Sequence, residues 1–303
     1  MTWAIRKPSP AVTDGTEEAP PEQGVVVSRQ AQHDSAAGGA VNRSSISLRD
    51  VRVVYQRGRR QSGLIALDHT NLDVGEREFV SLLGPSGCGK TTLLKVIGGL
   101  IEPTQGEVSV LGGTVDEARR QHAFGFVFQD ANLLPWRKAL SNARLLAEVI
   151  GKEAVDEERI RDLLRQVGLD GFEGSYPRQL SGGMRQRVGI VRALAFDPAV
   201  LLMDEPFAAV DALTRDVLAE VLLGVWAQAR PLLFVTHSIE EAVFLSDRVI
   251  VMTARPGRVL EEVPIDLPRP RTREMRDSLA FAEVRRRLRQ AVDRAQELGG
   301  SPL

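Results

Sequence analysis

The chain reads Phe79-Val80-Ser81-Leu82-Leu83-Gly84-Pro85-Ser86-Gly87-Cys88-Gly89-Lys90-Thr91 between positions 79 and 91. The first five residues are mostly apolar, as in a strand that is buried on both faces of a sheet. The next eight fit the pattern G-x-x-x-x-G-K-[ST], and a helix is predicted over residues 90–99, where two glycines end it. A strand, a glycine-rich loop and a helix in this order predict a phosphate-binding loop.

The residue types of this loop suit a bound phosphate chain. Its glycines let the backbone pass close to phosphate oxygens, so that successive N–H groups can point at them, and the helix N-terminus adds partial positive charge. Lys90 supplies a cation for the outer phosphates, and the Thr91 hydroxyl suits Mg²⁺. Because Cys88 lies inside the loop, we expect its thiol to react with a small maleimide and a bound ligand to slow the reaction. The alternative is a buried, inert thiol.

Two further apolar strands are predicted to deliver polar side chains. Residues 200–203 lead to Asp204 and Glu205, and residues 232–235 lead to His237. Since successive strand residues point to opposite faces, we expect Asp204 to address Mg²⁺ while Glu205 is free to orient or deprotonate a water. His237 follows a sheet strand, where sites form in α/β proteins, and is a candidate sensor of the terminal phosphate.

A second candidate anion site lies in the segment Leu180-Ser181-Gly182-Gly183-Met184. Ser181 is placed as the N-cap of a helix predicted over residues 185–196, and the two glycines expose N–H groups at its start. Many helices begin in this way, so the segment taken alone predicts no more than a capped helix.

Hydrophobic patterning predicts an α/β fold. Strands are expected at residues 46–55, 64–74, 79–83, 200–203, 232–235 and 249–252. A polar turn at residues 58–63 separates the first two, and helical stretches separate the later ones. Within the helical region 140–176, Ile160, Leu163, Leu164 and Val167 share one helix face. We therefore expect a parallel sheet of α/β type with a helical insertion.

The two ends of the chain differ from its centre. Residues 1–43 are rich in Pro, Ala, Gly, Ser and Gln and predict a disordered leader. Residues 272–296 are dense in arginine and carry Phe281, Val284, Leu288 and Val292 in helical register. Two interpretations of this tail stay open, a solvated face beside a packing stripe and a face near anionic headgroups, and we favour the first.

Composition narrows the function classes. The 303 residues include 39 Lys plus Arg, 40 Asp plus Glu and one cysteine. A chain without a basic surplus is not built for nucleic acid as its main partner. A single cysteine excludes an intramolecular disulfide and fits a reducing compartment. No segment approaches the ~18–20 apolar residues of a membrane span, and no signal peptide is recognisable. We therefore expect a cytoplasmic protein with a peripheral membrane role.

The order of these motifs resembles that of the ATPase subunits of ABC transporters, over almost all of residues 44–265. In the company of the phosphate loop, the Leu-Ser-Gly-Gly segment is specific for this family. The resemblance implies a P-loop NTPase with a mainly parallel sheet core, an antiparallel β subdomain and a helical subdomain at about residues 135–195. A helical tail at residues 266–303 would follow.

The resemblance also implies cofactors and site residues. ATP and Mg²⁺ would be held by the loop residues Gly84, Pro85, Ser86, Gly87, Cys88, Gly89, Lys90, Thr91 and Thr92. Tyr55 would stack on adenine, and Gln129, after a strand at residues 124–128, would contact both Mg²⁺ and the membrane subunit. Thr91, Gln129 and Asp204 are thus the expected metal-site residues.

Other implied roles concern catalysis and a partner copy. Lys90 would act with Glu205, which activates the water, and with His237, which contacts the γ-phosphate. In a homodimer, Ser181, Gly182 and Gly183 would bind the nucleotide held by the other protomer, and Asp211 would lie across the interface.

Finer features resemble the nitrate/sulfonate/taurine-type importer branch. They are Gln129-Asp130-Ala131-Asn132-Leu133-Leu134-Pro135-Trp136, Asp211-Ala212-Leu213-Thr214-Arg215, Arg255-Pro256-Gly257-Arg258 and Leu267-Pro268-Arg269-Pro270-Arg271. One departure is Phe207-Ala208-Ala209-Val210-Asp211, where the family pattern is Phe-Gly-Ala-Leu-Asp. Ala208 and Val210 are expected to affect dimer packing and to leave the chemistry in place.

The leading hypothesis is an importer ATPase at the cytoplasmic face of the membrane, partnered by integral membrane permease subunits and, indirectly, by a solute-binding protein. A soluble ABC ATPase of DNA repair is the alternative, but its long coiled-coil arms do not fit the roughly 90 residues between Lys90 and Ser181. A non-catalytic regulator should have lost Glu205 or His237, and both are present. The cargo stays open among sulfonate, nitrate, taurine and a small heterocycle.

Overall fold

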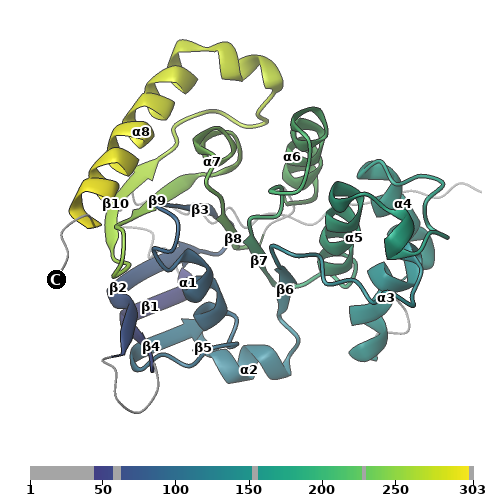
Figure 1. The fold of residues 1–303 in the computed structure, drawn as a ribbon, viewed down its shortest axis with the longest axis horizontal. Helices are drawn as coiled ribbons and strands as arrows, with labels where there is room; N and C mark the ends of the chain where they lie inside the picture. Colours follow the sequence, from purple (N-terminus) through teal and green to yellow (C-terminus); the bar gives the residue numbers. More distant parts are fainter. Residues whose placement is uncertain (1–43, 57–62, 152–155, 227–229, 300–303) are drawn as a thin grey trace, which may run out of the picture. The chain divides into compact units, whose positions relative to one another are not determined.

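A computed structural model describes residues 44–56, 63–151, 156–226 and 230–299 of the chain. The predicted leader at residues 1–43, and residues 58–62 of the predicted turn, lie outside the described residues. The described part combines two β-sheets with helices that pack on them and a separate group of helices (Figure 1).

The larger sheet has six strands in the order β10-β9-β3-β8-β7-β6. Its parallel strands are β9 (Arg248–Met252), β3 (Phe79–Leu83), β8 (Leu232–Val235), β7 (Val200–Asp204) and β6 (Phe124–Val127). β10 (Val259–Pro264) pairs with β9 in the antiparallel sense. Every residue of β3, β7 and β8 is buried, which explains why their sequences are short apolar runs rather than alternating ones.

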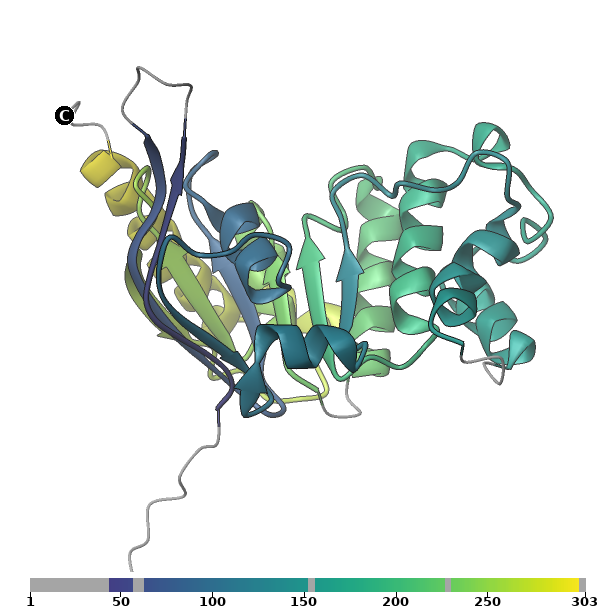
Figure 2. The same ribbon diagram turned by 90° about the horizontal axis from the view of Figure 1, so that it is seen from below.

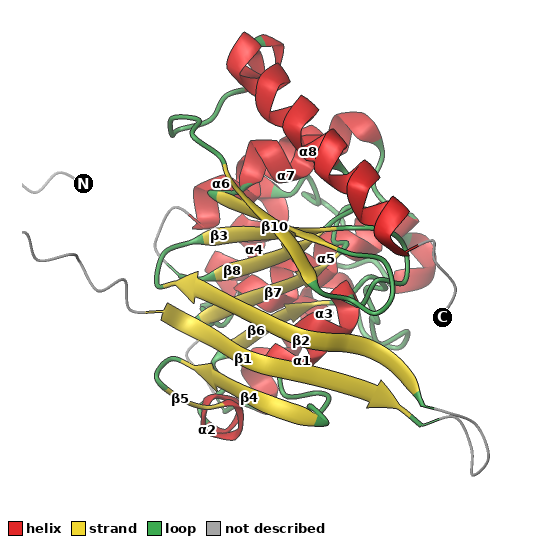
Figure 3. Cartoon of the chain, turned by 90° about the vertical axis from the view of Figure 1, so that its left-hand side faces the viewer, coloured by secondary structure: helices red, strands yellow, loops and turns green. Residues whose placement is uncertain are grey.

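The smaller sheet is antiparallel, with the order β2-β1-β4-β5 (Figure 3). Its strands are β2 (Leu64–Gly75), β1 (Ser44–Tyr55), β4 (Gln105–Val110) and β5 (Gly113–Thr114). The short helix α2 (Val115–Arg120) follows β5 and begins with a capping box at Thr114. β4 was not predicted from the sequence, because four of its six residues are exposed and it therefore contains no apolar run. The α/β class with an antiparallel subdomain is confirmed.

Helix α1 (Lys90–Ile97) packs between the two sheets. It contacts β2 and β4 on one side and β7 and β8 on the other. Its buried Leu93 and Leu94 belong to one apolar cluster with Leu48 of β1 and Leu202 of β7. The helix that follows the phosphate loop is thus fixed by burial along its length, which holds its N-terminus at the edge of the larger sheet.

The chain between β6 and β7 forms a helical region (Figure 2). Its helices are α3 (Ala139–Val149), α4 (Glu157–Gln166) and α5 (Gly182–Leu194), with a short 3-10 helix, η1 (Pro177–Gln179), before α5. The helical pattern predicted over residues 140–176 thus resolves into two helices and a turn-rich segment. The predicted apolar face of α4 is confirmed, because Ile160 and Leu164 are fully buried against α3 and α5.

Helices α6 (Ala212–Trp226) and α7 (Ile239–Leu245) connect the later strands, and the tail returns over them. The tail begins with a 3-10 helix, η2 (Arg273–Asp277), and the long helix α8 (Leu279–Gly299) starts later than predicted. The reason is Ser278, whose hydroxyl accepts a hydrogen bond from the Phe281 N–H at 3.2 Å and so marks the helix start. α8 then packs on α7, β9 and β10 (Figure 1).

The arginines of α8 face acids of the domain beneath it. Arg285 pairs with Glu240 at 3.3 Å, while Arg287 at 3.1 Å and Arg294 both pair with Glu261. Together with the buried stripe, these pairs favour the solvated-face interpretation of the tail. In the part of the chain that the structure describes, no helix is both long and apolar enough to cross a membrane.

The packing stripe of α8 makes the tail part of the folded domain. Leu288 is fully buried, so Leu288→Ala should lower the free energy of unfolding by about 2–5 kcal/mol through lost apolar burial and a residual cavity. Arg289→Ala, at the exposed next position, should change it by less than about 0.5 kcal/mol. Urea unfolding followed by circular dichroism measures both, and equal midpoints for the two variants would show that α8 does not pack as described.

Candidate functional site

The carboxyl ends of the parallel strands meet at one edge of the larger sheet. β3 leads there into the phosphate loop, β7 ends at Asp204, and β8 leads to His237. The ladder aligns Val235 of β8 with both Leu82 of β3 and Asp204 of β7. Ligands of open α/β sheets bind outside these strand ends, so the sheet brings the predicted polar residues to one candidate site.

The phosphate loop has the backbone that its glycines permit. Gly87 and Gly89 adopt φ angles of 73° and 103°, in the left-handed region where other residues are strained. Gly89 is also the N-cap of α1, and it has no side chain to accept hydrogen bonds from the first helical N–H groups. These N–H groups are therefore available to an anion at the helix N-terminus.

Lys90 is buried against the loop rather than extended into solvent. Its ammonium group donates hydrogen bonds to the carbonyl oxygens of Gly84 at 2.8 Å and Pro85 at 3.0 Å. A phosphate oxygen is a stronger acceptor than a neutral carbonyl, because the hydrogen bond is then charged on both sides. The side chain is thus held beside the loop, ready to exchange these carbonyls for phosphate.

The predicted accessibility of the Cys88 thiol is wrong. The side chain is fully buried and belongs to the apolar cluster between the two sheets. The loop turns this side chain toward the core, so Cys88 can reach a ligand through its backbone alone. Its burial instead anchors the base of the phosphate loop.

Thr91 and Asp204 form the candidate metal site. The Thr91 hydroxyl donates a hydrogen bond to Oδ1 of Asp204 at 3.0 Å, across 113 positions of sequence. Asp204 is 4% exposed, and this burial raises the pKa of its carboxyl group, with the nearby Glu205 charge acting in the same direction. Among the described residues Asp204 forms no ion pair, although Lys95 and Lys90 lie near enough to lower its pKa, and a buried carboxylate of this kind is suited to bind a cation.

Glu205 and His237 lie next to each other above the sheet edge. His237 Nδ1 is 3.3 Å from Oε2 of Glu205. Strand alternation does not separate Glu205 from Asp204 as predicted, because β7 ends at Asp204 and Glu205 has a left-handed φ of 45°. This turn leaves Asp204 buried and Glu205 partly exposed, so the two carboxylates face different surroundings.

A supporting network beneath His237 was missed in the sequence. Thr236 donates a hydrogen bond from its hydroxyl to Glu241 at 2.5 Å, and Arg215 of α6 approaches the same carboxyl group at 3.5 Å. Burial raises the pKa of Glu241, against the lowering effect of the Thr236 hydrogen bond. The spacing Ser238-x-x-Glu241 in the sequence is typical of a helix N-terminus. In the structure the Ser238 side chain caps α7 directly after His237.

Tyr55 lies beside the phosphate loop, and Gln129 at the end of β6. The Tyr55 hydroxyl is 3.2 Å from that of Thr92, and the residue is 39% exposed, which fits a surface for a stacked base. Gln129 is exposed after the end of β6, where Gln186 donates a hydrogen bond to the Phe128 carbonyl oxygen at 2.9 Å. This bond ties the helical region to the sheet edge through the residue before Gln129.

The structure does not bring every predicted residue to the phosphate loop. Ser181 caps α5 by accepting a hydrogen bond from the Met184 N–H at 3.2 Å, and Asp211 accepts one from the Thr214 N–H at 3.0 Å. That backbone hydrogen bond lowers the pKa of Asp211.

These two segments lie together. A methyl group on Gly183 would be 3.2 Å from the Ala209 carbonyl oxygen. Among the described residues, no hydrogen bond or ion pair joins either segment to the phosphate loop. Of the two departures from the family pattern, Val210 is buried and Ala208 is exposed.

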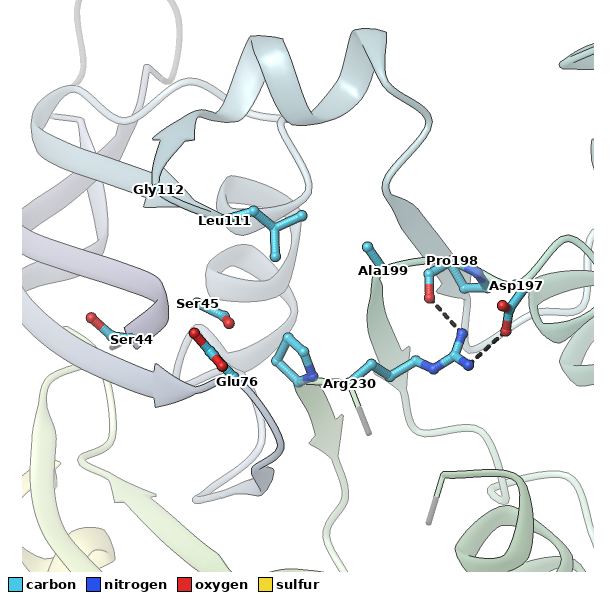
Figure 4. Close-up of a pocket in the computed structure, with 10 residues that line it drawn as sticks. Ser44, Ser45, Glu76, Leu111, Gly112, Asp197, Pro198, Ala199 and Arg230 are labelled. Carbon is cyan, nitrogen blue, oxygen red and sulfur yellow. Dashed lines mark hydrogen bonds and ion pairs between the residues drawn. The ribbon is translucent and has the colours of Figure 1, made fainter. Parts of the chain in front are cut away.

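An open pocket of about 840 Å³ lies elsewhere, at the amino ends of β7 and β8 (Figure 4). Arg230 crosses it and donates hydrogen bonds to the Pro198 carbonyl oxygen at 2.5 Å and to Asp197 at 2.6 Å. Ser44, Glu76 and Leu111 line it from the side of the smaller sheet. None of the predicted site residues lines it, and it lies at the strand ends opposite to the phosphate loop.

Comparison with known proteins gives matches over most of the chain. A family model described as ABC transporter matches residues 67–208. An uncharacterised ABC transporter ATP-binding protein of Methanocaldococcus jannaschii is 51% identical over 74% of this chain and 82% of that protein. A taurine import ATP-binding protein of Rhizobium johnstonii is 44% identical over 77% of this chain and 91% of that protein. An aliphatic sulfonates import ATP-binding protein of Bacillus cereus is 40% identical over 82% and 96%.

A solved structure gives the same picture of the fold. It is the dimeric post-hydrolysis state of the ATP-binding cassette MJ0796 bound to ADP and Pi, with a TM-score of 0.66 and 34% identity. The match covers 74% of this chain and all of that one.

The burial of Asp204 generates a prediction about stability. The pKa of the Asp204 carboxyl group in the folded chain is above the ordinary value of 3.8. The stability that the protonated carboxyl group contributes is therefore fully present below about pH 3.8, and it is lost as the pH rises through the pKa of the folded chain. At neutral pH without divalent metal, Asp204→Asn should therefore raise the midpoint of urea unfolding, since the amide oxygen can still accept the Thr91 hydrogen bond.

Addition of Mg²⁺ with nucleotide should raise the melting temperature of the wild-type protein more than that of Asp204→Asn. Thermal unfolding with and without the ligands measures this difference. A variant that is less stable without metal, or equally stabilised by it, would contradict the description of Asp204 as a desolvated metal ligand.

Proposed function

We propose that this chain, which belongs to the family of ABC transporter ATP-binding proteins, hydrolyses ATP to power the import of a small solute through separate membrane subunits. The observation that carries this function is the set of groups at one sheet edge: the phosphate loop, the Thr91–Asp204 pair and the Glu205–His237 pair. Each group suits one part of the hydrolysis of a nucleoside triphosphate. The identity with import ATP-binding proteins supports the direction of transport.

The triphosphate would lie along the phosphate loop, with its adenine on Tyr55. The N–H groups of the loop and of the α1 N-terminus would donate hydrogen bonds to the phosphate oxygens, and Lys90 would leave the carbonyls of Gly84 and Pro85 to pair with the outer phosphates. Because the fold fixes the backbone N–H groups before the ligand arrives, these groups can stabilise charge without moving, and only the Lys90 side chain has to change its partners.

The oxygen donors of Thr91 and Asp204 fit Mg²⁺, which prefers hard oxygen ligands and is usually bound by few protein groups together with phosphates. Gln129, at the end of the neighbouring strand, is the proposed third contact. Bound Mg²⁺ would supply positive charge that offsets the charge developing on the transferred phosphoryl group.

Glu205 is the proposed general base. It is partly exposed, so a water can reach it, and it sits beside His237 at the sheet edge. His237 would contact the γ-phosphate and keep Glu205 oriented, while the Thr236–Glu241 network would hold the histidine's strand end in place. Removal of a general base typically lowers a rate by 10²–10⁴.

The second anion site points to a dimer. Ser181, Gly182 and Gly183 lie at an exposed helix N-terminus, and no hydrogen bond or ion pair among the described residues joins it to the phosphate loop of the same chain. In a dimer with two-fold symmetry, each such terminus could face the nucleotide of the other protomer. The dimeric cassette among the structural relatives supports this arrangement, in which Asp211, adjacent to the Gly183 segment, would lie at the interface.

The proposed partners are integral membrane permease subunits, which would place this chain at the cytoplasmic face of the membrane as a peripheral subunit. The proposed cargo class is a small sulfonate, taurine or a similar anion, because the named relatives include sulfonate and taurine import ATP-binding proteins.

The base and the dimer are tested together by Glu205→Gln, which keeps the shape of the side chain and removes the base. We expect hydrolysis to fall by about 10²–10⁴ while ATP binding survives, so that the variant accumulates as an ATP-bound dimer. Size-exclusion chromatography with light scattering, in MgATP or MgADP, measures the dimer. Glu240→Gln is the matched control, because this exposed carboxyl group of α7 contacts Arg285 and not the site. Wild-type hydrolysis by Glu205→Gln, or an ATP-bound monomer, would contradict the proposal.

The transport role is tested by uptake. A source strain without this gene should lose ATP-dependent uptake of taurine, an alkane sulfonate or nitrate, measured with labelled substrates. The wild-type gene should restore uptake, and Lys90→Ala should not, because the outer phosphates lose their cation. Unchanged uptake of all three substrates in the deletion strain would refute import of this cargo class.

A further inference from the structure

We propose that the loop formed by residues 253–258 is an outer brace of the phosphate loop, and that Arg255 and Gly257 are positioning residues for the binding of nucleotide phosphates. The inference rests on the proposed function and assigns roles to two residues that the catalytic description leaves unused. The loop connects β9 to β10 and contacts the phosphate loop at Gly87 and Cys88.

The first contact is made by the Arg255 guanidinium group. Its Nη2 donates a hydrogen bond to the carbonyl oxygen of Gly87 at 3.3 Å, across 168 positions of sequence. Gly87 sits at the bend of the phosphate loop with a left-handed φ of 73°. The Arg255 side chain is otherwise exposed, so its charge adds to the electrostatic potential of the loop without being neutralised by a described ion pair.

The second contact is made by the backbone of Gly257. A methyl group at this position would lie 2.0 Å from the carbonyl oxygen of Cys88. Gly257 cannot move away, because its N–H donates to the Ala66 carbonyl oxygen and its own carbonyl accepts from the Asp68 N–H, both at 3.0 Å. The hydrogen bonds to β2 therefore hold this glycine in direct contact with the phosphate loop.

These contacts fix the orientation of two successive peptide units. A trans peptide is planar, so its carbonyl oxygen and its N–H point in opposite directions. With the carbonyls of Gly87 and Cys88 directed at the brace, the N–H groups of Cys88 and Gly89 are directed away from it. The Cys88 N–H closes the turn onto Pro85, at 3.3 Å, and the Gly89 N–H is left for phosphate. The brace thus sets the direction of the donors in the loop.

The brace is itself rigid. The Thr253 hydroxyl donates to the Pro256 carbonyl oxygen at 2.9 Å and accepts from the Arg258 N–H at 3.1 Å. The side chain of Arg258 pairs with the buried carboxylate of Asp68. The Ala254 N–H donates to the Ala295 carbonyl oxygen of α8 at 3.1 Å, which connects the tail helix to the same loop.

A charged brace should affect the phosphates and not the adenine. Loss of the Arg255 hydrogen bond and charge should weaken binding of ATP and ADP, and should leave AMP, which has no β-phosphate, almost unaffected. Because the Arg255 charge is exposed, the loss of affinity should become smaller as ionic strength rises. Salt screens exposed charges over a Debye length of about 10 Å at 0.1 M and over shorter distances at higher concentrations.

The experiment is isothermal titration of the full chain with ATP, ADP and AMP. Arg255→Gln should raise the dissociation constants of ATP and ADP by about 3- to 10-fold, with Arg255→Lys in between and the melting temperature unchanged. The matched control is Arg289→Gln, which removes one exposed arginine of α8 away from the loop. Equal ATP affinity of wild type and Arg255→Gln would overturn the role of Arg255, as would an equal loss for AMP.

Gly257→Ala tests the steric part of the brace. It should weaken ATP binding by about tenfold or more, since the added methyl group must displace the Cys88 carbonyl or β2. Gly174→Ala is the control, because a methyl group there meets nothing within 4 Å. If Gly257→Ala melts like the wild type and binds ATP equally well, the brace does not exist. In each of these outcomes the wild-type chain still binds ATP. If the proposed function itself were wrong, the wild-type chain would not bind ATP.

Discussion

The hydrogen-bonded alignment of five parallel strands is the constraint on which the candidate site depends. The ladder places the ends of β3, β7 and β8 at one level, so that the phosphate loop, Asp204 and His237 leave the sheet side by side. These strands are buried at every residue, and a change of register by one residue would turn their side chains to the opposite face. The apolar core thus fixes the positions of polar groups that contribute little to its stability.

Around this edge, several groups are held in states that differ from those they have in the unfolded chain. Asp204 is a desolvated carboxylate, Glu205 has a left-handed backbone conformation, and the Lys90 ammonium group rests on carbonyl oxygens. Each state has a cost in the free chain that the surrounding packing must offset. A metal-bound triphosphate would pair with the carboxylate and the ammonium group together, so the site favours binding over stability.

The phosphate loop and the Ser181 helix start differ in how the rest of the chain supports them. The 253–258 loop and β2 pack against the phosphate loop. The Ser181 helix start, in contrast, is exposed on the helical region. Two sets of donors that share no hydrogen bond or ion pair in the described part of the chain suit a ligand that both sets contact. A bound nucleotide would then act as part of an interface, and its hydrolysis would weaken that interface. The hydrogen bond from Gln186 to the Phe128 carbonyl oxygen links the sheet edge to the helical region that carries the Ser181 helix start.

The sequence by itself determined the features that neighbouring residues encode. The apolar runs identified β3, β7 and β8, and the glycine spacing identified the phosphate loop. The helical spacing of apolar residues predicted the buried face of α4. Tertiary structure alone decided which residues meet across the chain. It buried the Cys88 thiol, set Glu205 in a left-handed turn, and put Arg255 against Gly87. The physical reason is range: a period or a turn reflects local sterics and hydrogen bonding, whereas a contact across 168 positions depends on how two sheets and a helix pack between them.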